Sequence, residues 1–147
     1  MEGQLLPFSV RIPPLTTLQS LCNDEVVAHF CRQHPEYNTS EAVQVFKDLL
    51  SWMWLTLERK ARGRATWMFG PLLILDAMWH SFILHTRAYC AFCEAHFGTY
   101  FHHDVESPAA PFEPAPEMLE DYLSDCFAKL GEAWVMRYFG DAFSELP

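Results

Sequence analysis

The residues best suited to chemistry gather in one stretch of the chain, from Leu75 to Asp104. This stretch holds five of the seven histidines and two of the five cysteines. Asp76 and His80 are four positions apart, so on a helix their side chains share one face. A carboxylate at that spacing can join the imidazole at a metal ion, or it can orient the ring through a hydrogen bond.

Two later residues extend this candidate site. Cys93 and His103 each follow a possible turn, and a helical hairpin would bring both back toward His80. Zinc accepts aspartate, histidine and thiolate ligands, and two histidines with a carboxylate also suit non-haem iron. Asp76, His80, Cys93 and His103 are therefore candidate ligands for a divalent metal, zinc or iron, while the cofactor itself stays unknown from the sequence.

A purely structural explanation of the same residues stays open at this point. His80 could be buried and hydrogen-bonded to Asp76 or to a backbone carbonyl, which would stabilise an interhelical contact. Cys93 could be a core side chain, since free cysteine behaves as a small apolar residue. His103 could belong to a turn.

The cysteines offer two further hypotheses, and both are weaker. Cys90, Cys93 and His96 form a CxxCxxH run, but on a continuous helix they spread around about a third of the circumference. Cys93 could act as a nucleophile if a nearby histidine activated it, although no local signature supports this. Catalytic residues therefore stay unknown at the level of the sequence.

The elements that must position these residues are predicted to be helices. Apolar residues recur at helical spacing, and we expect an all-α single domain over residues 1–147 with five or six helices. The expected helices cover residues 16–34, 41–62, two pieces between 72 and 97 that break at His85, 116–130 and 132–138. An extended arm over residues 1–15 and a proline-rich strap over residues 105–116, anchored by Phe112, complete the chain.

Particular residues mark the ends of these helices. Asn23 and Asp24 offer a restart inside the first helix, and Gly63 and Gly98 are suited to stop helices. The remaining start signals are Thr39 and Ser40 for the second helix and Thr86 for the piece after His85.

Three further side chains have expected roles of their own. Trp52 is expected to pack against another element, because it falls away from the apolar face of its helix. His29 and His34 are expected to have capping or surface roles, since a cation suits the carboxyl end of a helix.

Charge and cysteine content limit the function classes. The net charge is −9; residues 1–103 carry nine acids and eight bases, and residues 104–147 carry ten acids and two bases. Such an acidic segment repels phosphate backbones, so nucleic-acid binding is not expected. The apolar window from Trp67 to His85 contains Asp76 and His80, which favours a buried helix over a membrane span. Five scattered cysteines favour a reducing, cytoplasmic compartment.

The central stretch resembles a motif of the glycine-rich-domain-containing-protein-like family. The residues that carry the resemblance are Asp76, Trp79-His80, Ile83-Leu84, Thr86, Tyr89, Phe92-Cys93, Phe97-Gly98 and His102-His103. It covers about 30 residues clearly, and compact bacterial-type members without a glycine-rich tail are more similar in size than plant members. Some plant members carry RNA-binding sequences, but this chain has only six glycines, so RNA binding is not carried over. The resemblance implies a fold class and marks this stretch as the position of a candidate site. It implies no particular activity.

Two function classes follow from these observations. The first is a small soluble interaction or accessory module with a protein partner, suggested by the aromatic-rich helical body, the proline strap and the acidic region. The alternative is a metal-binding protein or metalloenzyme with its site at the four residues named above. Whether the protein is an enzyme stays undecided.

Overall fold

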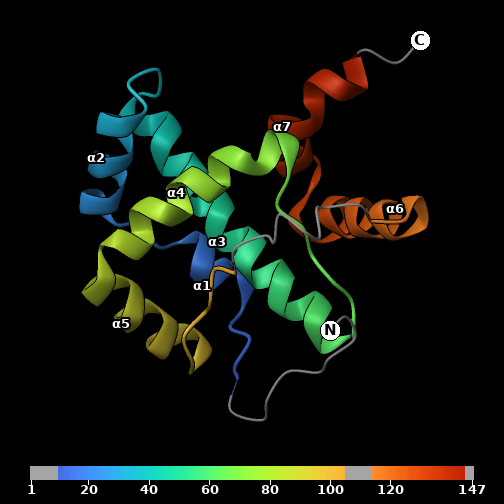
Figure 1. Cartoon of the computed structure of the whole chain (residues 1–147), viewed down its shortest axis with the longest axis horizontal. Coiled ribbons are helices and arrows are strands. Elements are labelled where there is room, and N and C mark those ends of the chain that lie inside the picture. Colours follow the sequence, from blue (N-terminus) through green and yellow to red (C-terminus); the bar gives the residue numbers. More distant parts are fainter. Residues whose placement is uncertain (1–9, 105–113, 145–147) are drawn as a thin grey trace. The chain divides into compact units, whose positions relative to one another are not determined.

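The computed structural model describes residues 10–104 and 114–144, and Figure 1 shows the arrangement of its elements. Contacts divide the chain into two compact units, Met1–Thr99 and Tyr100–Pro147, and each unit is described by itself. The residues described form seven α-helices and no strand, so the predicted all-α class is confirmed. The expected number of helices was too low, because the first expected helix is in fact two.

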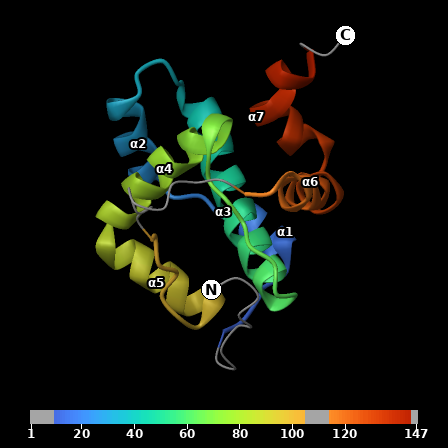
Figure 2. The ribbon, with the colours of Figure 1, turned by 45° about the vertical axis from the view of Figure 1, so that its right-hand side comes forward.

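The first unit is organised around its longest helix. Its elements are α1 (Leu15–Gln19), α2 (Asp24–Gln33), α3 (Thr39–Ala61), the 3₁₀ turn η1 (Gly70–Leu72), α4 (Leu73–Leu84) and α5 (Thr86–Phe97). Helix α3 contacts α1, α2 and α4, while α5 packs against α4, as Figures 1 and 2 show. The core therefore lies around α3, where Leu49, Leu50, Met53 and Leu55 are fully buried.

Asparagine residues start two of these helices. Asn23 accepts a hydrogen bond from the backbone N–H of Val26 at 3.1 Å, so the possible restart there is confirmed and the continuous helix over residues 16–34 is wrong. Asn38 and Glu41 form a capping box at the start of α3. The cap is thus Asn38, one residue before the predicted Thr39, because its side chain reaches the N–H of Glu41 at 2.8 Å.

The predicted helix ends after α3, α4 and α5 are confirmed. Gly63 (φ 74°) and Gly98 (φ 73°) adopt the left-handed conformation that other residues rarely take. The break between α4 and α5 falls at His85, where ψ is 68°. Thr86 is the first helical residue of α5 and makes no side-chain capping bond, so its predicted capping role is wrong.

The described part of the N-terminal arm, residues 10–14, is non-helical and docks on the end of α5. The backbone N–H of Arg11 donates to the carbonyl of Phe97 at 2.8 Å, and its guanidinium donates to those of Glu94 and Ala95. These carbonyls lie in the last turn, where a helix offers few donors of its own, although that of Glu94 also accepts from the N–H of Gly98. Phe8 of the arm, and most of the strap with Phe112, lie outside the described residues.

The connector between α3 and η1 is fixed to the core, and the predicted tertiary packing of Trp52 is confirmed. Trp52 Nε1 donates to the carbonyl of Trp67 at 3.3 Å, and its ring lies 5.3 Å from that of Trp79. Trp79 is on α4, so Trp52 joins α3, the connector and α4.

The second unit contains two α-helices in its described part, joined by a π-helical turn. They are α6 (Pro116–Asp125), the π turn η2 (Cys126–Leu130) and α7 (Glu132–Ser144). The expected helix over residues 116–130 thus changes hydrogen-bond pattern at Cys126, and Gly131 (φ 98°) separates it from α7. The buried side chains of this unit include Tyr122, Cys126, Trp134, Val135 and Phe139.

No helix in the described ranges is both long and apolar enough to cross a bilayer. The apolar window over residues 67–85 instead supplies α4, which has twelve residues. Its role in the core explains its apolar composition.

Candidate functional site

Helix α4 presents Asp76 and His80 on a side that solvent reaches. Its sequence, LILDAMWHSFIL, is apolar around most of its circumference. The buried side chains that fix its rotation are Leu75, Met78, Trp79, Ser81 and Phe82. The imidazole of His80 and the carboxylate of Asp76 consequently face outward, with side-chain exposures of 59% and 24%.

The predicted proximity of these two groups is confirmed. His80 Nε2 lies 3.6 Å from Asp76 Oδ2. This separation exceeds a good hydrogen bond, and an exposed ion pair of this kind contributes at most about 1 kcal/mol to stability. The explanation in which His80 is a buried, satisfied core histidine is wrong, because the ring is exposed.

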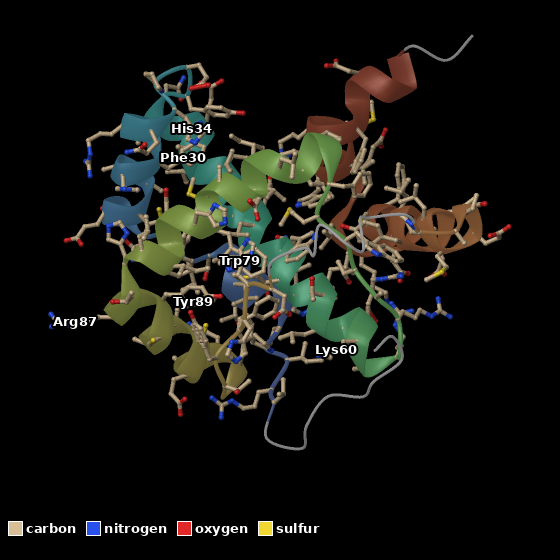
Figure 3. The ribbon with its side chains drawn as sticks, in the orientation of Figure 1. Phe30, His34, Lys60, Trp79, Arg87 and Tyr89 are labelled. Atoms are coloured by element: carbon tan, nitrogen blue, oxygen red, sulfur yellow. The ribbon has the colours of Figure 1, made fainter. Side chains whose placement is uncertain are left out.

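A buried aromatic pair holds α4 in place beside α5. Trp79 Nε1 donates to the hydroxyl of Tyr89 at 2.9 Å, and both side chains are at least 96% buried. Figure 3 shows the two residues between α4 and α5. Phe82 packs edge-on against Tyr89, with ring centroids 4.9 Å apart. Because His80 follows Trp79 directly, this contact fixes the backbone that carries the imidazole.

Ser81 connects two further histidines. Its hydroxyl lies 3.0 Å from Nδ1 of His29 on α2, and its backbone carbonyl lies 2.7 Å from Nδ1 of His85. The two rings are themselves in edge contact, with centroids 5.5 Å apart. Since a carbonyl can only accept, Nδ1 of His85 must donate, and this bond satisfies a carbonyl in the last turn of α4.

A pocket of about 310 Å³ lies between α2 and α4. Its lining consists of His29, Gln33, His34, Ala77, His80, Ser81 and Leu84. His34 is the C-cap of α2, as predicted, and its ring stacks on Phe30 with centroids 4.6 Å apart. Figure 3 shows both residues at the end of α2. His80 therefore has the carboxylate of Asp76 beside it and also borders this pocket.

The other two predicted ligands occupy different surroundings. Cys93 is 1% exposed on the inner side of α5, and in the ranges 10–104 and 114–144 it joins no group of three ligating side chains. Cys90 is exposed and His96 is half-buried, as expected for a CxxCxxH run spread around one helix. His103 is half-buried in the coil of the second unit. The four-residue site as a whole stays a prediction.

The contact between His29 and Ser81 was not predicted from the sequence. His29 was assigned a capping or surface role, but it is half-buried and bonds across to α4. A signal was available: Ser81 is a polar residue in an apolar helical run, and a buried hydroxyl needs a hydrogen-bond partner. The sequence could not indicate which residue supplies it, because the partner is 52 positions away.

The fold and this region define a small all-α protein with an exposed aspartate–histidine pair next to a histidine-lined pocket. The chain belongs to the UCP032817-like family, which it matches over residues 18–120. The match includes all of α2 to α5 and each predicted ligand. No curated protein and no solved structure matches the chain. The resemblance to the glycine-rich-domain-containing-protein-like family stays untested.

Proposed function

We propose that this protein binds a divalent transition metal, with Asp76 and His80 as ligands from α4. The observation that carries the proposal is the distance of 3.6 Å between Asp76 Oδ2 and His80 Nε2. Two ligand atoms at about 2.0–2.2 Å from a tetrahedral ion lie roughly 3.3–3.6 Å apart. The pair thus has the separation of two metal ligands and is too long for a good hydrogen bond.

His103 is proposed as the third ligand. This keeps the prediction made from the sequence, because an imidazole offers one ligand atom to a metal ion. Two imidazoles and one carboxylate form a ligand set that suits zinc or iron(II), and it leaves coordination positions for water or substrate. Cys93 is left out of this set because its thiol is buried in the packing of α5.

The described part of the first unit gives the interaction-module hypothesis little support. The most exposed large apolar side chains of the first unit are Leu73 and Leu84, at 55% and 68%. They stand at opposite ends of α4, eleven residues or about 16 Å apart, so they do not make one continuous patch. Isolated exposed leucines are ordinary on protein surfaces.

Elemental analysis of protein purified without a histidine tag tests the metal proposal. We expect a stoichiometric first-row metal in the wild type, and its loss in Asp76→Asn and His80→Gln. Glu94→Gln and His96→Gln make the same chemical changes on α5 and should retain the metal. Absence of metal from wild type after growth and reconstitution with zinc and iron, or equal loss in the control variants, contradicts the proposal.

A further inference from the structure

The pocket between α2 and α4 has a chemistry of its own, which goes beyond the metal site with which it shares His80. We infer that it binds a small monocarboxylate, whose carboxylate contacts residues of α2 and whose hydrocarbon group contacts residues of α4. Three features carry this inference: an oriented imidazole N–H at His29, an amide donor at Gln33, and an apolar wall at Ala77 and Leu84.

The hydrogen bond between His29 and Ser81 favours one tautomer of His29. Ser81 is 4% exposed, and a hydroxyl so little exposed is expected to donate to a protein acceptor. Of the contacts described for that hydroxyl, Nδ1 of His29 at 3.0 Å is the one that can accept. The neutral ring then carries its proton on Nε2. His29 therefore offers an N–H donor at the pocket, held in orientation by a buried partner.

Gln33 supplies a second donor one turn away. His29 and Gln33 are four positions apart on α2 and both line the pocket, so their side chains are neighbours on one face. A carboxylate has two oxygens in one plane and accepts from two donors at once. No lysine or arginine lines the pocket, which favours a single negative charge over a phosphate dianion.

The opposite wall is suited to a short hydrocarbon group. Ala77 and Leu84 belong to α4, and Leu84 is 68% exposed, so a ligand would remove apolar surface from water. A volume of about 310 Å³ is at the small end of ligand sites, which span roughly 300–1,000 Å³. Isobutyrate, a branched acid of about six non-hydrogen atoms, is therefore a suitable probe, with a dissociation constant on the order of 1 mM.

The test is an NMR titration of isotope-labelled protein with isobutyrate, with isobutanol as a control that lacks the carboxylate. We expect saturable shifts of the His29 imidazole and the Ala77 methyl with the acid alone, and a His29 ring protonated at Nε2. Ser81→Ala should weaken binding about fivefold, because the tautomer is no longer fixed. Gln33→Glu, at an exposed position, should weaken it by about tenfold or more through charge repulsion. Gln19→Glu on α1 should leave it unchanged.

Three results would overturn the inference. They are absence of shifts at His29 and Ala77, equal binding of isobutanol, and equal effects of Gln33→Glu and Gln19→Glu. The titration is run on zinc-loaded and on chelator-treated protein. Acid binding to protein that takes up neither zinc nor iron(II) refutes the metal proposal alone, and binding of either metal without acid binding refutes this inference alone.

Discussion

Removing the hydroxyl of Tyr89 tests the contact that fixes α4 beside α5. Tyr89→Phe keeps the ring and its edge contact with Phe82, but deletes the acceptor that lies 2.9 Å from Trp79 Nε1. Both side chains are buried, so water cannot replace the lost partner at low cost. Loss of a partner by a buried donor costs about 1–3 kcal/mol. We therefore expect the free energy of unfolding to fall by about 2 kcal/mol.

Urea unfolding followed by tryptophan fluorescence measures this change. With a denaturant slope of about 1–3 kcal/mol/M, the midpoint should fall by roughly 1 M. Tyr37→Phe is the matched control, because the same hydroxyl is deleted at a half-buried position. It should change stability by less than about 0.5 kcal/mol at neutral pH. If Tyr89→Phe destabilises no more than this control, the bond to Trp79 does not hold α4 and our account of the site's position fails.

Three further predictions concern the helix ends and one tyrosine. Asn38→Ala should lower the stability of the protein by about 1 kcal/mol in thermal unfolding, because the N-cap of α3 is lost. Thr39→Ala should not, and equal effects of the two substitutions would contradict the assignment of the cap to Asn38. Arg11→Ala should speed amide hydrogen exchange in the last turn of α5 with little change in global stability, since the lost bonds are exposed; unchanged exchange would contradict this. Burial, and after it the charges of Glu36 and Glu41, raise the pKa of Tyr37 above its usual value of 10.0. The contribution of Tyr37 to the free energy of unfolding should therefore be fully present below pH 10, and it should be lost as the pH rises through the folded-state pKa. Tyr37→Phe should reduce that alkaline loss, and an identical profile would refute the assignment.

Local signals explain why much of the fold was predictable. Gly63 and Gly98 end helices because a left-handed residue is needed there, and a sequence shows this directly. Asn23 marks the restart of α2 for an equally local reason. The cap at Asn38 was misplaced by one residue because Asn38, Thr39 and Ser40 all have side chains that can cap a helix. Only the backbone geometry chooses among them.

The candidate site was predictable only where its residues are close in sequence. The separation of Asp76 and His80 follows from one turn of helix, and the structure confirms it. Pairing of His29 with Ser81 depends on how α2 packs against α4, which no local pattern encodes. Cys93 was grouped with the ligands on its chemistry and on an expected helical hairpin, and its position on the inner side of α5 places its thiol in the core.

X-ray absorption spectroscopy at the zinc edge, on zinc-loaded wild-type and His80→Gln protein, tests the metal site most directly. We predict a first shell of nitrogen and oxygen at about 2.0–2.1 Å with imidazole scattering, and one imidazole fewer in the variant. A sulfur shell at about 2.3 Å, or a variant spectrum identical to that of wild type, would show that zinc binds elsewhere and would contradict the assignment of Asp76 and His80.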